Sequence, residues 1–171
     1  MKQGFIDAFQ YKAWANQEIL NFGSRQFDRL PQEDGTYFLR ILNHTAVVDA
    51  LFIARLRGRP DPFDSDNTVD TPTLESLRNF MSQNDSELIA ISESVEALDR
   101  WISFTFADGD CGQMTVAEIF MHLLTHGSNH RGMASRTLAN NQLDRPRDTF
   151  TRFLHQRDPA RRVAEHGGRE A

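Results

Sequence analysis

Four long segments repeat apolar residues every three to four positions, and this helical period restricts the fold more than any other feature of the chain. The segments run approximately over residues 5–22, 36–57, 73–95 and 115–140. Glycine, proline and acidic residues separate them. Amphipathic helices of this length bury their apolar stripes against one another. We therefore predict an all-α protein, a four-helix bundle that forms one domain over residues 1–157.

Local signals place the ends of the second and third helices. Thr36 can cap the second helix, and Gly58 followed by Pro60 ends it. The third helix begins near Thr71 or Thr73, because the proline between them suits a first helical turn. The intervening segment is rich in proline and acidic residues, so we expect an irregular loop there.

The fourth long helix has the clearest N-terminal signal. Thr115 and Glu118 have the spacing of a capping box, in which each side chain bonds the free backbone N–H of the other. From there the helix runs to about Asn140. We expect a short helix from Thr149 to about Gln156 and a mobile C-terminal tail over residues 158–171.

The segment before the fourth helix changes period. Ile102, Phe104 and Phe106 alternate along the chain with Trp101, Ser103 and Thr105. This alternation is typical of a strand. Asp108 and Gly109 form a typical hairpin turn pair. The sequence therefore predicts a short hairpin, or an extended crossover, before the last long helix.

Composition restricts the partners and the compartment. The net charge of −5 argues against a nucleic-acid partner. Cys111 is the only cysteine, so no intrachain disulfide can form, which fits a cytoplasmic protein. The N-terminus lacks the uninterrupted apolar stretch of a signal peptide. No run approaches the ~20 apolar residues of a membrane helix, so we expect no membrane partner.

Histidines recur at helical spacing within the fourth helix, at His122, His126 and His130. Residues four apart lie about 40° apart around a helix and ~6 Å along it, so two of these rings can converge on one ion. The spacing allows either 122 with 126 or 126 with 130. His44, on an apolar face of the second helix, is the candidate third ligand. The alternative to a metal site is that the spacing of the three histidines on the fourth helix arose by chance and that His44 is a core residue hydrogen-bonded to a neighbour.

The residue types favour a particular kind of metal site. Three neutral imidazoles without cysteine suit Zn²⁺ or Ni²⁺. Three protein ligands leave a coordination position open, as in catalytic sites, whereas structural zinc usually has four protein ligands. Asp49 lies about 140° around the helix from His44 and is expected to form a salt bridge. Arg131 could orient an anionic substrate, but we expect a surface ion pair. No general acid or base is identified.

Three stretches resemble the DinB/YfiT-like family, which is unrelated to the translesion polymerase of the same name. They are YKAWANQEIL, ILNHTAVVDALFIARLRG and TVAEIFMHLLTHGSNHRGM, spread over about residues 5–140. The resemblance implies a four-helix bundle with a divalent ion, often nickel or zinc, on His44, His126 and His130. It implies that His122 occupies a position where the family often has histidine but not the usual ligand.

The resemblance also implies a range of functions. Family members can be dimers, and some use a low-molecular-weight thiol as co-substrate in transferase or isomerase reactions. Met133 stands beside the site, at a position where glutamine is common after HRG, so the resemblance does not by itself fix the substrate class. We expect a metal-dependent enzyme with an unknown small-molecule substrate, either a thiol-using transferase or a hydrolase.

Two other functions fit the same sequence. The chain could be a non-catalytic bundle that binds a metal or a small molecule, or a structural helical dimer without metal. In all three cases we expect a homodimer, because thirteen phenylalanines exceed the obvious needs of one small core. Exposed aromatic patches commonly mark interfaces.

Overall fold

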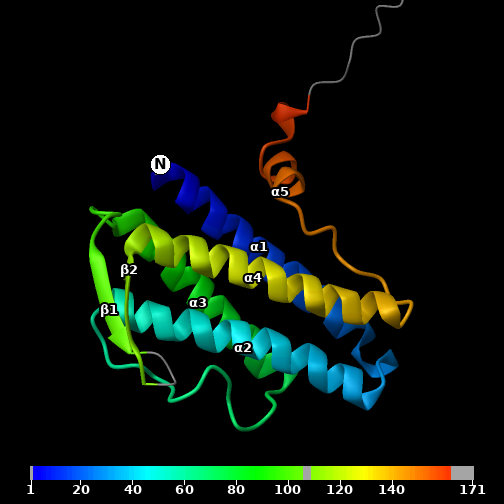
Figure 1. Ribbon diagram of the computed structural model, residues 1–171. Coiled ribbons are helices and arrows are strands. Elements are labelled where there is room, and N and C mark those ends of the chain that lie inside the picture. Colours follow the sequence, from blue (N-terminus) through cyan, green and yellow to red (C-terminus); the bar gives the residue numbers. More distant parts are fainter. Residues whose placement is uncertain (1, 106–108, 163–171) are drawn as a thin grey trace, which may run out of the picture.

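The computed structural model describes residues 2–105 and 109–162 and confirms the predicted four-helix bundle (Figure 1). The long helices are α1 (Lys2–Gln26), α2 (Gln32–Leu56), α3 (Leu74–Ser94) and α4 (Val116–Asn140). The smaller elements are 3₁₀ turns at Phe27–Arg29 and Pro159–Arg161, strands β1 (Trp101–Thr105) and β2 (Cys111–Thr115), and helix α5 (Phe150–Arg157).

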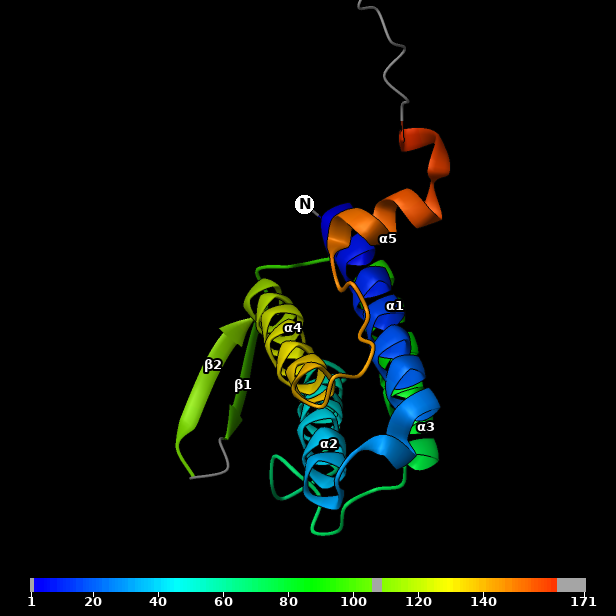
Figure 2. The same cartoon turned by 90° about the vertical axis from the view of Figure 1, so that its right-hand side faces the viewer.

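The four helices form a closed arrangement in which each packs on two others. Helices α1 and α2 each contact both α3 and α4, so α1 and α2 lie on one diagonal of the bundle (Figure 2). Helices α2 and α4 run in opposite directions along a shared seam (Figure 1). This seam carries the histidines singled out in the sequence.

The apolar core is divided into two clusters, one at each end of the bundle. The first, beside the hairpin, includes Phe9, Phe52, Leu88, Ile102 and Phe120. The second, beside the connection from α1 to α2, includes Ile19, Phe38, Leu42, Leu77 and Leu138. Each long helix contributes to both clusters. Buried polar residues occupy the level between them.

That polar layer is built around Lys12, whose side chain is 1% exposed. Its Nζ lies 2.5 Å from Asp49 Oδ2 on α2 and 3.4 Å from Asp85 Oδ1 on α3. Asn16, one turn later on α1, donates to both oxygens of Asp85 at 2.9 and 3.0 Å and accepts from Arg131 Nη1 of α4 at 3.2 Å. Desolvation opposes the charge of Lys12, but the two carboxylates raise its pKa overall. The layer thus joins all four helices through charged groups.

Two sequence expectations about these charges need correction or refinement. Arg131 was expected to form a surface ion pair, but it is 1% exposed and donates from Nε to Asp148 at 2.8 Å. Its guanidinium also lies over the Tyr11 ring, with Cζ 5.7 Å from the ring centroid. Asp49 does form a salt bridge, as expected, but in the middle of the core. The helical period predicts the angle between Asp49 and His44 around α2, but it does not predict which residues of other helices face Asp49.

The ends of α3 and α4 follow the predicted signals, whereas α1 continues through Gly23 to Gln26. The capping box is present, since Thr115 Oγ1 accepts from Glu118 N at 3.2 Å and Glu118 Oε2 accepts from Thr115 N at 2.7 Å. Thr73 caps α3 by accepting from the backbone N–H of Ser76. Helix α2, however, begins at Gln32 rather than at Thr36.

The early start of α2 has a local cause. Pro31, with φ −52°, is the residue that precedes the helix, and its fixed φ orients the chain for the first turn. Glu33 and Asp34 lie in that first turn, where negative charge is favoured by the helix dipole. The polar segment before Thr36 is therefore helical although it lacks an apolar stripe.

The predicted hairpin is present and covers one end of the bundle (Figure 1). Strands β1 and β2 pair antiparallel, with Ile102 opposite Met114. Ile102 and Phe104 are buried against the first core cluster. Phe106 and Asp108 lie outside the described residues, as do residues 163–171 of the expected tail. Gly109 has φ +95°, which suits the turn position predicted for it.

Helix α2 is long and apolar enough, by length and composition alone, to cross a membrane. Its most apolar window has a mean hydropathy of 1.3, and 72% of that window is buried inside the bundle. Buried core helices meet the same criteria, and α2 is packed by α3, α4 and β1. Its apolar character is accounted for by this packing.

Replacing Lys12 with methionine should destabilise the fold. The change leaves Asp49 and Asp85 buried without their cation, which typically costs about 3–5 kcal/mol of unfolding free energy. Urea denaturation measures the effect, with Lys2→Met at the exposed start of α1 as the matched control. A loss no larger than that of the control would show that the ionic layer is not a stability determinant.

Candidate metal centre

The structure brings His44, His126 and His130 together on the seam between α2 and α4. His44 lies in the middle of α2, and the other two lie one turn apart on α4. The Nε2 atoms of His44 and His130 each lie 3.0 Å from Nε2 of His126. All three ligand atoms lie within 4.8 Å of one another, in a group that could hold a metal ion. These are the three histidines that the sequence resemblance implied.

The tautomer of His44 follows from its second nitrogen. Nδ1 lies 2.8 Å from the backbone carbonyl of Asp66, which can only accept a hydrogen bond. In the neutral ring Nδ1 therefore carries the proton, and the lone pair of Nε2 faces the other two histidines. Asp66 belongs to the loop between α2 and α3, so this loop orients one ligand of the group.

The environment keeps the two histidines of α4 neutral. Desolvation, followed by the neighbouring His130 and His44, lowers the pKa of His126 to about 3. Desolvation, followed by His44, also lowers the pKa of His130. Only the neutral imidazole has a free lone pair for a metal, so the site is held in its binding form.

The donor set fits a borderline divalent ion. Zinc binds imidazole nitrogen at about 2.0–2.1 Å, and two such bonds at roughly a right angle place their nitrogens about 3 Å apart. Two of the three nitrogen pairs have this separation. Three neutral nitrogens pointing at one another cannot all be satisfied by mutual hydrogen bonds, because each ring carries one proton. An ion satisfies all three at once.

Unpartnered atoms also mark this cluster as more than a packing feature. Within the described ranges, the buried side-chain atoms that lack a hydrogen-bond partner are Asp49 Oδ1, His126 Nδ1 and His130 Nδ1. Leaving such atoms unpaired typically costs ~1–3 kcal/mol each, and native proteins tolerate this mainly at functional sites. Two of the three atoms belong to the histidine cluster. The cost is consistent with a site selected for binding rather than for stability.

His122 lies beside the cluster but outside the group of converging ligand atoms. Its ring stacks on His126 with centroids 5.2 Å apart, and it contacts the Phe52 ring at 5.2 Å. Desolvation lowers its pKa. The contacts give His122 a packing role that supports one face of His126.

Contacts on an adjacent face of α4 explain the glycine that directly follows His126. A Cβ atom on Gly127 would lie 3.0 Å from Cε of Lys12, which passes directly across this position. Arg131, the residue after His130, faces the same interior layer. Each α4 ligand is thus followed by a residue that contacts the ionic layer, and this contact fixes the rotation of the helix about its axis.

Three residues of this environment were not identified from the sequence as parts of a site. Asp66 lies in an irregular loop, where no periodicity relates it to His44. Lys12 and Asn16 did leave a signal, since they lie four residues apart on the stripe that also carries Phe9 and Leu20. Polar residues on an apolar stripe indicate that they are buried with polar partners, so the sequence does indicate buried partners for Lys12 and Asn16.

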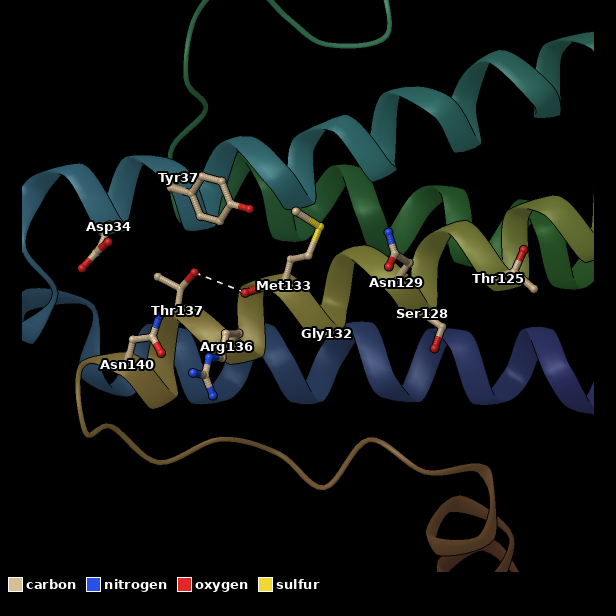
Figure 3. Close-up of a pocket in the computed structure, with 10 residues that line it drawn as sticks. All are labelled: Asp34, Tyr37, Thr125, Ser128, Asn129, Gly132, Met133, Arg136, Thr137 and Asn140. Atoms are coloured by element: carbon tan, nitrogen blue, oxygen red, sulfur yellow. Dashed lines mark hydrogen bonds between the residues drawn. The ribbon is translucent and has the colours of Figure 1, made fainter.

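Two hollows flank the cluster along the seam. On the side of the α2 N-terminus lies an open groove of about 800 Å³, shown in Figure 3, where Tyr37 of α2 faces Met133 of α4. Its other lining residues are Asp34, Thr125, Ser128, Asn129, Gly132, Arg136, Thr137 and Asn140. On the hairpin side lies a second pocket of about 730 Å³ with His122 and Asp66 in its wall.

Comparison with known proteins identifies a family. The model of the DinB family matches residues 1–161, which is nearly the full chain. No curated protein and no solved structure matched the chain in the corresponding searches. The functional argument therefore depends on the family and on the geometry of this site.

Substitutions should separate the ligands from their neighbour. His126→Ala removes the central nitrogen and should lose most of the bound metal, because two imidazoles hold an ion poorly. His122→Gln, one turn away, should keep the ion with affinity at most ~10-fold weaker, as for residues that only support a ligand. Elemental analysis after dialysis against zinc measures both. Equal losses in the two variants would show that the pair on α4 is assigned wrongly.

The lowered pKa of His126 should appear as a pH dependence of stability in metal-free protein. Its pKa is about 3 when folded but ~6.5 in the unfolded chain, so at pH 5 only the unfolded state is protonated. The contribution of His126 to the free energy of unfolding is fully present above about pH 6.5 and is lost progressively as the pH falls toward 3. Urea denaturation at pH 7 and pH 5 should show a larger loss in the natural chain than in His126→Leu. The same loss in both would contradict the assignment.

Proposed function

We propose that this chain, which belongs to the DinB family, is an enzyme that uses a divalent metal ion held by His44, His126 and His130. The observation that carries the proposal is the convergence of three imidazole Nε2 atoms from two helices. Nickel and zinc are the ions best suited to three nitrogen ligands without cysteine. When bound, such an ion supplies a Lewis acid with a coordination position left for a substrate atom.

The residues of the chain itself supply binding and orientation. The carbonyl of Asp66 holds the tautomer of His44, and His122 supports the ring of His126. Two hollows along the same seam give space for organic groups, and one of them has His122 and Asp66, which contact the ligand histidines, in its wall. Enzymes commonly bind substrates in concave sites of this size with few polar groups.

A transfer reaction fits this site better than hydrolysis. Hydrolysis benefits from a general base beside the attacking water. Among the described residues, the metal-ligand group contains histidines alone. The nearby Asp66 carboxylate contacts His44 from its Nδ1 side, at 3.7 Å, away from the converging Nε2 atoms. A thiol that bound to the ion would be acidified by it and would release its proton to solvent without a protein base, so we propose a thiol-using transferase, with a hydrolase as the second candidate.

The alternative to catalysis is a bundle that only binds a metal or a small molecule. The flanking hollows favour the enzyme, because a purely structural zinc site is usually closed by a fourth protein ligand. No cysteine or carboxylate joins the three histidines in the described part of the chain. Metal binding without turnover of any substrate would support the alternative.

A homodimer is also proposed, although the phenylalanine argument for it is weak. The described phenylalanines are buried or half-buried except Phe150, so the core accounts for most of them. Exposed apolar side chains lie instead along α2 and α4, at Tyr37, Met121 and Met133. Sedimentation at micromolar concentration tests the dimer, and a monomer there would count against it.

Activity should depend on the metal. Chelation should abolish turnover, and added nickel or zinc should restore it. The assays are a low-molecular-weight thiol with an electrophilic arene, and separately an activated ester. His130→Ala should lose activity together with metal, whereas Asp28→Asn at the exposed 3₁₀ turn should change neither. Turnover that survives complete removal of the metal would reject the mechanism.

A further inference from the structure

The pocket on the hairpin side of the histidines has the size and walls of a binding site for a small organic molecule. It measures about 730 Å³, within the range of pockets for drug-sized ligands. Its walls come from α2, the loop after it, the hairpin and α4. The lining residues are Leu51, Phe52, Arg55, Asp61, Phe63, Asp64, Ser65, Asp66, Thr105, Met114 and His122.

Two wall residues connect this pocket to the metal centre. His122 stacks on His126, with ring centroids 5.2 Å apart. Asp66 accepts a hydrogen bond from Nδ1 of His44 through its backbone carbonyl. A molecule in the pocket would therefore lie against residues that contact two of the three ligands.

One side of the pocket is apolar and rigid. Phe52 packs edge-on against Phe104, with centroids 5.5 Å apart, and contacts His122 on another side. Leu51, Phe63 and Met114 complete this side. The side chain of Phe63 is only half-buried, although its ring packs against Phe80. These walls suit an aromatic or branched aliphatic group.

Among the described wall residues, the one lysine or arginine is Arg55, and its charge is already neutralised. Arg55 donates from Nε and Nη2 to Asp61, at 2.8–3.2 Å, and from Nη2 to the carbonyl of Thr105. Its guanidinium also lies over the rings of Phe52 and Phe104, at 5.1 and 4.6 Å. Arg55 is thus fixed as part of the wall and is not free to bind an anion.

Two acidic side chains of the pocket have no such counter-charge. Within residues 2–105 and 109–162, no lysine or arginine forms an ion pair with Asp64 or Asp66. The His44 ring also lies near Asp66, with Nδ1 3.7 Å from Oδ2, but a histidine that ligates a metal is neutral and supplies no counter-charge. The pocket therefore combines an apolar side with a rim of uncompensated negative charge.

We propose that this pocket binds the organic substrate of the metal site, and that the substrate carries an apolar ring-sized group and a cationic ammonium group. The ring-sized group would lie against Phe52, Phe63 and Met114, and the ammonium group beside Asp64 and Asp66. A carboxylate or phosphate at the same place would meet like charge. The inference deepens the proposed function, on which it rests for the role of the pocket, but the binding preference itself needs no catalysis.

The test compares phenylpropylammonium with phenylpropanol and phenylpropionate, which share one carbon skeleton and differ in charge. Calorimetry on the full chain, both metal-free and metal-loaded, should give the cation about fivefold to tenfold tighter binding than the alcohol, as expected for exposed carboxylates. The carboxylate is compared in metal-free protein, where it cannot ligate the ion, and should bind weakest. Equal affinities, or tighter binding of the carboxylate, would overturn the proposal.

Variants locate the effect. Asp64→Asn combined with Asp66→Asn keeps the backbone carbonyl that orients His44 and should remove the preference for the cation. Phe63→Ala should weaken the binding of the cation and of the alcohol by similar factors. Asp28→Asn should change neither affinity. A preference that persists in the double variant would overturn the proposal. Failure of the metal-dependent activity would leave the preference in metal-free protein intact, so the two proposals fail separately.

Discussion

The ion pair between Lys12 and Asp49 is the interaction on which the rest of this structure depends. A charged ammonium can be buried in a helical bundle only if carboxylates and hydrogen bonds replace its water, and Asp49 and Asp85 do so from two other helices. Asn16 and Arg131 extend the layer to α4. Because apolar packing alone tolerates small shifts of one helix along another, this layer is what fixes the level at which the four helices meet.

The candidate metal site lies at that same level on an adjacent face of α4. Gly127 and Arg131 face the ionic layer, and the residues immediately before them, His126 and His130, face α2. The contacts of Gly127 and Arg131 therefore set the rotation of α4 about its own axis. This rotation directs His126 and His130, on the adjacent face, toward α2. His44 is aimed from α2 by the loop carbonyl of Asp66. The site combines a rigid pair on one helix with a third ligand whose orientation depends on a loop, and the same loop forms the wall of the proposed substrate pocket.

Much of the fold was predictable because its signals are local. The apolar period gave four long helices, the spacing of Thr115 and Glu118 gave the start of α4, and strand alternation gave the hairpin. The start of α2 was missed by four residues, because Pro31 and the first-turn acids act without an apolar stripe. Arg131 was placed on the surface because its partner, Asp148, lies in an irregular segment that no period relates to α4.

The sequence by itself determined the helices, because they form through backbone hydrogen bonds within a few residues. Their apolar faces and the histidines at one-turn spacing then follow from the helical period of 3.6 residues. It left two histidine pairs on α4 equally suitable, and only the family resemblance distinguished them. The tertiary structure decided which nitrogens converge, which rings are neutral and which charges lie in the core. Those properties depend on distances and desolvation between residues far apart in the sequence, 82 positions for His44 and His126, and such contacts exist only once the helices have packed.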